Sequence, residues 1–304
     1  MSRNESDRNR DKTMYGGIEA GGTKFVCGIG TGPEDLRVVS FPTTRPDECV
    51  RQSIEFFREK AGTTLSAVGI ASFGPIDLDP GSRTYGYITT TPKPKWRDYD
   101  IVGAITKALA VPLAFDTDVN AAALAEAQWG AARDVKDSLY ITVGTGIGGG
   151  AVIGGRVIHG LMHPEMGHIR VPHDWKDDPF TGACPSHGDC LEGLASGPAI
   201  LQRWGIRAED LPVDHHAWHL EAHYLALALS TFVCSLSPQR IILGGGLMQQ
   251  QTLFPMVRHG VAKLLNGYIA KPQLHEEVNR YVVPPQLGRH AGVLGAILLA
   301  KNML

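Results

Sequence analysis

The chain has few cysteines, little net charge and no long apolar run. Its five cysteines are an odd number in 304 residues, and the N-terminus lacks the apolar core of a signal peptide, which argues against a disulfide framework. A formal net charge of -2 provides no broad basic surface for a nucleic acid or an anionic membrane. No apolar stretch reaches the roughly 18 residues of a membrane helix. We therefore expect a cytoplasmic protein whose partners are small molecules, with a disordered leader over residues 1–13.

Alternating strand and helix patterns predict an α/β protein with two domains. Residues 14–30 and 139–155 each read as a strand, a glycine-rich turn and a second strand, which suggests two domains of similar design. Residues 67–74 and 111–119 resemble buried strands of a largely parallel sheet. Helical patterns cover the remaining segments, listed by residue number as 47–62, 120–132, 215–238 and 289–304.

Three glycine-rich loops are candidate phosphate cradles. "GIEAGGTK" (17–24) departs from the P-loop in residue order, and "GTGIGG" (144–149) precedes a strand where a dinucleotide-binding fold needs a helix. Glycine still lets backbone N–H groups approach phosphate, and Thr23, Lys24 and Thr145 add donors. With "GGG" (244–246), the loops would fit a nucleoside triphosphate in a cleft between two domains, although each alone could be an ordinary tight hairpin.

Two carboxylates end the predicted strand in "FDTDVN". Transfer of phosphate to an alcohol needs a base near the hydroxyl group, and α/β proteins place ligand contacts at strand ends. Asp118 is one candidate and Asp116 is its rival. Asp118 could instead cap the helix expected near Asn120.

Cys184, His187 and Cys190 have the spacing C-x2-H-x2-C, which predicts a zinc site. His168, His173 and Asp174 are candidates for the fourth ligand. Four protein ligands leave no open position, so such a zinc would be structural. The alternative is a pair of reduced thiols with a histidine nearby.

The motifs together resemble the ROK (repressor, ORF, kinase) branch of the sugar kinase and actin-like ATPase superfamily. They are "GGIEAGGTK", "DTDVNAAALAE", "TVGTGIGGG", "EMGHI", "CPSHGDCLEG" and "IILGGG", in the family's order and across nearly the whole chain from Met14. The resemblance implies two actin-like (ribonuclease H-like) domains, residues 14–117 and 118–286, with a cleft between them. A final helix, residues 287–304, would pack back on the first domain, and the protein would form a homodimer.

The resemblance also assigns roles to residues. It makes Asp118 the catalytic base and His168 the fourth zinc ligand. Its implied sugar contacts are Gly74, Pro75, Thr117, Glu165, His168 and Glu192. Its implied nucleotide contacts are Gly21, Gly22, Thr23, Lys24, Thr145, Gly146, Gly244, Gly245 and Gly246. Many relatives have Asn where this chain has Thr117, so one sugar contact differs and glucose specificity does not carry over.

The expected activity is ATP-dependent phosphorylation of a hexose 6-hydroxyl with Mg²⁺. "TTPKPKW" (90–96) and the Cys-Pro-x-His-Gly-x-Cys loop resemble the fructokinase subgroup, which favours fructose. Glucose, mannose and N-acetylmannosamine are alternatives. A sugar-sensing repressor is disfavoured because a DNA-binding module of some 60 residues would have to precede Gly16, and a sugar-binding protein without kinase activity would not need the base.

Overall fold

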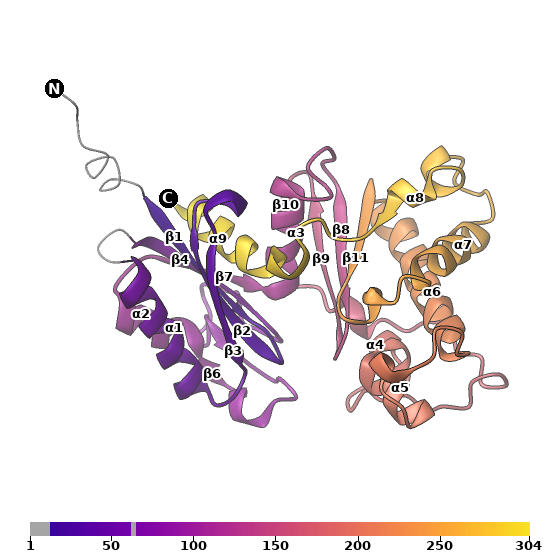
Figure 1. Ribbon diagram of the computed structural model, residues 1–304, viewed down its shortest axis with the longest axis horizontal. Coiled ribbons are helices and arrows are strands. Elements are labelled where there is room, and N and C mark those ends of the chain that lie inside the picture. The colour runs from indigo at the N-terminus through magenta and orange to yellow at the C-terminus, as the bar shows by residue number, and fades with distance from the viewer. Residues whose placement is uncertain (1–12, 62–64) are drawn as a thin grey trace. The chain divides into compact units, whose positions relative to one another are not determined.

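The computed structural model describes residues 13–61 and 65–304, in which the chain forms two compact units (Figure 1). The leader expected at residues 1–13 lies outside the described residues except for its last one. The first unit comprises the chain up to Ala125 with His159–His163 and Arg289–Leu304, and the second comprises Glu126–Ile158 and Pro164–Gly288. Among the described helices, none combines the length and the apolar character needed to cross a bilayer.

The first unit is built on a five-stranded sheet in the order β3-β2-β1-β4-β7. β1, β4 and β7 are parallel, whereas β2 and β3 are antiparallel to their neighbours, so the sheet is mixed where a largely parallel one was expected. The elements of this unit are β1 Met14–Ala20, β2 Lys24–Gly30, β3 Arg37–Pro42, α1 Pro46–Ala61, β4 Leu65–Ser72, β5 Tyr87–Ile88, β6 Tyr99–Asp100, α2 Ile101–Leu109, β7 Leu113–Thr117, the start of α3 Asp118–Trp129, and α9 Ala291–Met303.

The second unit repeats this plan with the order β10-β9-β8-β11-β12. Again three strands, β8, β11 and β12, are parallel, and the hairpin strands β9 and β10 are antiparallel. Its elements are β8 Ser138–Val143, β9 Ile147–Ile153, β10 Arg156–Val157, α4 Leu191–Ala195, α5 Gly197–Trp204, α6 Ala217–Leu236, β11 Arg240–Gly244, α7 Leu253–Leu265, α8 Val278–Tyr281 and β12 Val282–Val283. The two hairpins expected from the sequence are therefore present, one at the start of each sheet.

Short 3₁₀ helices occupy several connections. They are η2 Pro33–Asp35, η3 Pro94–Trp96, η4 Met166–His168, η5 Ala208–Asp210, η6 Leu247–Gln249, η7 Pro272–Leu274 and η8 Gly288–His290. Two of them, η3 and η4, lie in segments that carry candidate functional residues.

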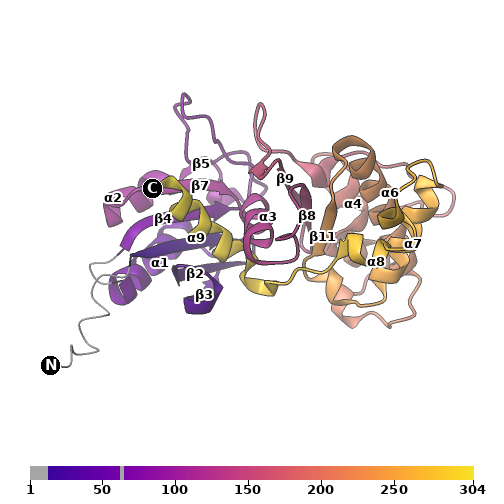
Figure 2. The same cartoon turned by 90° about the horizontal axis from the view of Figure 1, so that it is seen from above.

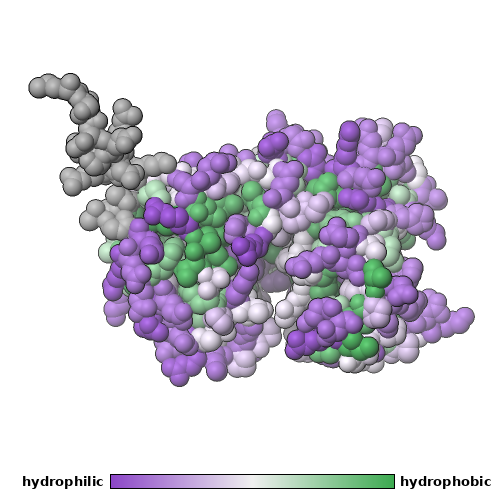
Figure 3. Space-filling model, in the orientation of Figure 1, coloured by the Kyte–Doolittle hydropathy of each residue, from purple (hydrophilic) through white to green (hydrophobic). Residues whose placement is uncertain are grey.

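Helix α9 lies along the sheet of the first unit, against β1, β4 and β7 (Figure 2). The close approach depends on Gly69 of β4, where a side-chain carbon would collide with the carbonyl oxygen of Ala296. α1 packs on β1 and β2 from the other face, because Gly16 of β1 faces Phe57 of α1 whereas the neighbouring Gly17 faces Val293 of α9. Hydrophobic side chains gather on the first unit where α9 and the neighbouring strands lie (Figure 3).

The first turns of α3 also belong to the first unit, beyond the boundary expected at residue 117. The physical reason is packing, because Ala121 is fully buried in a small cluster with Ala71 of β4 and Ala296 of α9. Asp118 is therefore a residue of the first unit, where the domain boundary expected from the sequence had assigned it to the second.

Candidate functional site

Three loops of the first unit meet at one edge of its sheet. Ala20 of β1 pairs with Ser72 of β4, and Ser72 pairs with Thr117 of β7, so these parallel strands end side by side. The residues that follow are the Gly21–Lys24 turn, Phe73 with Gly74 and Pro75, and Asp118. The sequence predicted functional residues in all three places, and strand register brings them together.

Thr117, not Asp118, caps α3. The Thr117 hydroxyl oxygen accepts the backbone N–H of Asn120 at 3.1 Å, which is the contact an N-cap makes. Asp118 is the first residue of the helix, and its Oδ1 accepts the N–H of the adjacent Val119 at 2.9 Å, which is not an N-cap contact. The alternative reading of Asp118 as the cap is therefore wrong, and the hydroxyl expected to contact sugar has a structural task.

Asp118 is a half-buried carboxyl group with a perturbed pKa. Burial raises its pKa to about 6, while hydrogen bonds from the backbone of Val119 and of Asp118 itself act in the opposite direction. The N-terminus of α3 also favours the ionised form. At neutral pH the group is ionised yet far more basic than an ordinary aspartate, which suits it to accept a proton.

Asp116, the rival candidate, is held by protein groups. Its side chain is 3% exposed, and its Oδ1 accepts a hydrogen bond from Asn120 Nδ2 at 2.8 Å. His159 Nε2 lies 3.0 Å from Oδ2, and this hydrogen bond raises the pKa of His159. These partners hold the Asp116 carboxylate in place, and no local pattern in the sequence places His159 beside it.

Glu19 is a functional candidate that the sequence reading missed. It precedes the Gly21–Lys24 turn on β1, and within the described residues its buried Oε2 has no hydrogen-bond partner. Burial, followed by the negative charge of Asp118, raises the pKa of Glu19 to about 7, against the influence of Lys24. The signal was present in "GIEAGG", because a carboxylate at the end of a strand before a phosphate-type turn is suited to a cation.

Gly74 and Pro75 are held in place by His163. The His163 ring is 4% exposed, and its Nε2 accepts the N–H of Ile76 at 3.1 Å. The Pro75 carbonyl accepts the N–H of Thr89 at 2.8 Å. This loop is thus fixed at the edge of the sheet, and His163 is another residue whose place the sequence did not predict.

In the second unit, two glycine-rich turns also lie at one edge of the sheet. Gly244 of β11 pairs with Thr142 of β8, so the turns Gly144–Gly146 and Gly244–Gly246 follow adjacent parallel strands. The Gly144 carbonyl accepts the N–H of Gly197, the first residue of α5, at 2.8 Å. Thr145, Gly245 and Gly246 are exposed, as donors to a bound phosphate must be.

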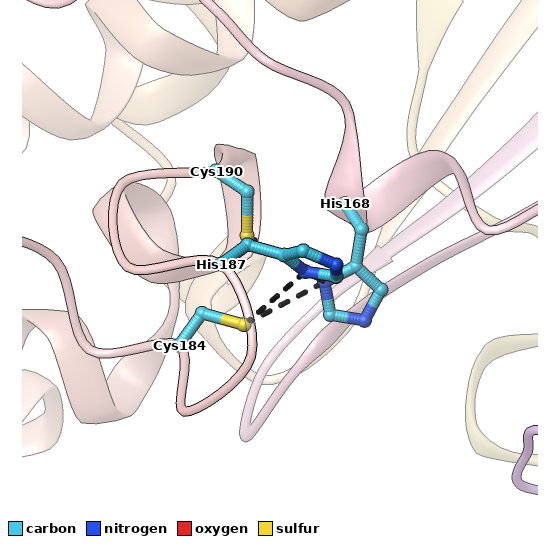
Figure 4. Close-up of side chains that lie close together, drawn as sticks. All are labelled: His168, Cys184, His187 and Cys190. Atoms are coloured by element: carbon cyan, nitrogen blue, oxygen red, sulfur yellow. Dashed lines mark hydrogen bonds between the residues drawn. The ribbon is translucent and has the colours of Figure 1, made fainter. Parts of the chain in front are cut away.

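Four side chains of the second unit converge as candidate metal ligands (Figure 4). They are His168, Cys184, His187 and Cys190, and their ligand atoms all lie within 4.8 Å of one another. His168 Nδ1 is 3.8 Å from Cys184 Sγ and 3.5 Å from Cys190 Sγ. His187 Nδ1 is 3.3 Å from His168 Nδ1 and 3.6 Å from Cys184 Sγ. Two thiols and two imidazoles at these separations form a set that could hold one metal ion.

His173 and Asp174 take no part in this cluster. His173 Nε2 lies 2.9 Å from the carbonyl oxygen of Asp178, and its Nδ1 lies 3.3 Å from Asp189 Oδ2. Asp174 accepts backbone N–H groups of the turn that follows it. Of the two histidines that could supply the fourth ligand, His168 faces the cluster. His173 instead contacts Asp178 and Asp189 of the same loop.

Glu192 connects the cluster to a glycine hairpin. It lies two residues after Cys190, on α4, and its Oε2 accepts the N–H of Ile147 at 2.9 Å. Helix η4, which carries His168 and follows Glu165, packs on β9 and α4. The three predicted sugar contacts of this unit, Glu165, His168 and Glu192, therefore lie on elements that pack together.

Comparison with known proteins identifies the family. The model of the ROK family matches residues 15–303. The chain belongs to the ROK family.

Relatives of this ROK protein cover nearly its whole length. Fructokinases of Zymomonas mobilis and Pediococcus pentosaceus are 45% and 44% identical to it, over 95% and 96% of this chain and 97% and 99% of their own sequences. A ROK family glucokinase from Streptomyces griseus, solved in complex with glucose and AMPPNP, is 25% identical with a TM-score of 0.76, covering 95% of this chain and 99% of its own. The actin-like fold expected from the sequence motifs is confirmed.

In this ROK chain, substitution of Thr117 tests its capping role. Thr117→Ala should lower the free energy of unfolding by about 1 kcal/mol, because the N–H of Asn120 loses its acceptor. Thr117→Asn should retain most of the stability, since asparagine is also a good N-cap. Urea denaturation of the three proteins measures both effects, and equal stability of the Ala variant and the wild type would contradict the assignment.

Proposed function

We propose that the protein transfers the terminal phosphate of ATP to the 6-hydroxyl of D-fructose, giving fructose 6-phosphate and ADP. The observation that carries this proposal is Asp118, a carboxylate of raised pKa that is not needed as a helix cap. The fructokinases at 44% and 45% identity support fructose as the substrate. The motif "TTPKPKW" and the histidine-containing metal loop support the same choice.

In the proposed reaction, Asp118 accepts the proton of the 6-hydroxyl while the sugar oxygen bonds to the terminal phosphorus of ATP. The bond from that phosphorus to the bridging oxygen breaks, and ADP leaves. The proton stays on the Asp118 carboxyl group until it is lost to solvent. Phosphoryl transfer requires little more than this base, correct positioning and neutralised charge.

Each unit carries candidate nucleotide contacts in the turns at the edge of its own sheet. In the first unit they are Gly21, Gly22, Thr23 and Lys24, and in the second they are Thr145, Gly146, Gly244, Gly245 and Gly246. Turns that follow parallel strands present backbone N–H groups, which suit phosphate oxygens. The AMPPNP in the related glucokinase supports a nucleotide substrate for this chain.

Glu19 fits the Mg²⁺ that accompanies ATP. Magnesium takes oxygen ligands, usually one or two carboxylates together with phosphate and water. The buried Oε2 of Glu19, without a partner in the described part of the chain, is a carboxylate oxygen suited to such an ion or to one of its waters. When bound, the ion offsets the charge of the phosphates.

Each unit, taken by itself, carries candidate sugar contacts. Gly74, Pro75 and Thr117 belong to the first, and Glu165, His168 and Glu192 to the second. Carboxylates and imidazole suit a polyol because each hydroxyl group both donates and accepts. His168 would use Nδ1 for the metal and Nε2 for the sugar, so the metal loop also orients a sugar ligand.

Zinc is the metal that the four-residue cluster fits. For zinc bonds of about 2.0 Å to nitrogen and 2.3 Å to sulfur, a tetrahedron places two nitrogens about 3.3 Å apart and nitrogen and sulfur about 3.5 Å apart. Four of the six separations, at 3.3, 3.5, 3.6 and 3.8 Å, lie close to these edges, and all the ligand atoms are within 4.8 Å of one another. Four protein ligands make the site structural, and its role is to fix the loop that carries Glu192.

Replacing the base tests the proposal. Asp118→Asn should lower kcat for fructose phosphorylation by at least about 100-fold, because the hydroxyl loses its proton acceptor. Fructose binding, measured by calorimetry, should change little. Full activity in this variant, assayed by transfer of labelled phosphate from ATP, would show that the assigned base is wrong.

The pH dependence gives an independent measurement of the same group. Only the ionised carboxylate accepts a proton, so kcat should fall as the pH is lowered through about 6, the pKa of Asp118. The residual rate of Asp118→Asn should lack this step. An unchanged profile in the variant would assign the titration to another group.

Cys184→Ser tests the zinc clamp. The wild type should contain about one zinc per chain, which the variant should lose together with affinity for fructose. Cys234→Ser is the matched control, because Cys234 is exposed on α6 and outside the cluster. Metal analysis and fructose titration measure both, and a fully active, zinc-free protein after chelation would contradict the clamp.

A further inference from the structure

The backbone around Lys93 is held in place at the edge of the first unit's sheet. It stands between Pro92 and Pro94 and precedes η3, whose Trp96 is 2% exposed. The Trp96 ring packs on Phe25 of β2, with centroids 5.3 Å apart, and its Nε1 donates to the carbonyl oxygen of Thr44 at 3.0 Å. Two prolines and a buried tryptophan therefore fix the backbone from which Lys93 extends.

The Lys93 side chain lies between two parts of the proposed site. Its Nζ is 5.9 Å from the centre of the Phe73 ring, next to the Gly74–Pro75 loop. Its stem crosses the Gly21–Lys24 turn, where a side-chain carbon at Gly22 would lie 3.1 Å from Lys93 Cε. Gly22 thus leaves room for the lysine stem, and the ammonium group is between the proposed sugar loop and the proposed phosphate turn.

In the part of the chain that the structure describes, the charge of Lys93 has no protein counterion. Within the described residues, no carboxylate forms an ion pair with its ammonium group, and no oxygen accepts a hydrogen bond from it. The side chain is half-buried, whereas Lys95, two residues further on, is exposed. A cation partly removed from water gains most from an anion that approaches it, and aromatic contact alone offsets only part of the lost hydration.

We propose that Lys93 binds the terminal phosphate of ATP and stays with that phosphoryl group as it passes to the sugar. This inference rests on the proposed kinase function and adds a residue to it. A lysine is a point charge suited to phosphate, and charge on the equatorial oxygens of the transferred group must be neutralised. The lysine exchanges no proton, so the atoms and electrons of the reaction balance as described for Asp118.

Substitution at position 93 separates the charge from the structure. Lys93→Met keeps the stem and removes the charge, and should lower kcat about 100-fold while the KM for fructose changes less than about threefold. Lys93→Arg should recover at least a tenth of the wild-type kcat. Lys95→Met is the matched control and should behave as the wild type. A raised KM for fructose with unchanged kcat would overturn the proposal, as would an Arg variant no better than Met.

Nucleotide binding provides a test that does not depend on the sugar. By calorimetry, Lys93→Met should weaken binding of the non-hydrolysable analogue AMPPNP about tenfold and leave ADP binding unchanged, because only the analogue has a terminal phosphate at this place. Equal effects on both nucleotides, or on neither, would contradict the contact. If the wild type instead bound AMPPNP but phosphorylated no sugar, the proposed function would fail while the Lys93 contact stood.

The geometry at Gly22 gives a further check through a double-mutant cycle. Gly22→Ala should lower kcat in the wild-type background by displacing Lys93, and should have a markedly smaller effect when Lys93 is already Ala. An equal fold-loss in both backgrounds would mean that Gly22 serves another purpose and would contradict the contact between the turn and the lysine.

Discussion

Parallel pairing of β1, β4 and β7 is the constraint on which the first half of the site depends. Because these strands end in register, their following loops share one edge of the sheet. The same arrangement places Thr117 and Asp118 at the start of α3, where they differ in their contacts. Thr117 caps the helix, and Asp118, one residue later, has a carboxyl group of raised pKa that is not needed as the cap.

In the first unit, strand register places the candidate functional residues. In the second unit, a cluster of histidine and cysteine side chains does so. The predicted sugar contacts of the second unit lie on short, irregular segments that a sheet cannot fix by itself. The side chains of His168, Cys184, His187 and Cys190 converge and bring these segments together. Glu192, two residues after Cys190, accepts the N–H of Ile147 and so fixes the glycine hairpin to the same loop. His173, bonded to Asp178 and Asp189, braces the loop with protein groups alone. Under the proposed function, a metal held by this cluster would influence sugar binding through the loop that carries Glu192.

The sequence predicted the elements better than their contacts. Glycine-rich hairpins, the α/β class and the final helix followed from local patterns, because turn residues and apolar periodicity act over a few positions. The spacing of Cys184, His187 and Cys190 indicated a metal loop for the same reason, and the family resemblance supplied Asp118 as the base and His168 as the fourth ligand. A homodimer came from the family pattern alone and stays a prediction.

Contacts between residues far apart in the sequence could not be predicted from local patterns. His159 reaches Asp116 from 43 residues away, and His163 reaches Ile76 from 87. No local pattern encodes such pairs, since they depend on how strands are ordered in the sheet. The parallel pairing of β4 with β7 and the antiparallel hairpins agree with the sequence, whereas the full strand order of each sheet was not predicted. The N-cap of α3 could not be assigned from the sequence, because Thr117 and Asp118 are both good capping residues and only the geometry decides between them.

The most direct test of the account is the product formed in competition. The protein, with Mg²⁺ and ATP labelled in its terminal phosphate, should be given fructose, glucose, mannose and N-acetylmannosamine at equal concentration. The account predicts that the label appears chiefly in fructose 6-phosphate, identified by the position of the phosphorus in an NMR spectrum. Label in a different sugar, at a different hydroxyl group, or in no sugar at all would contradict it.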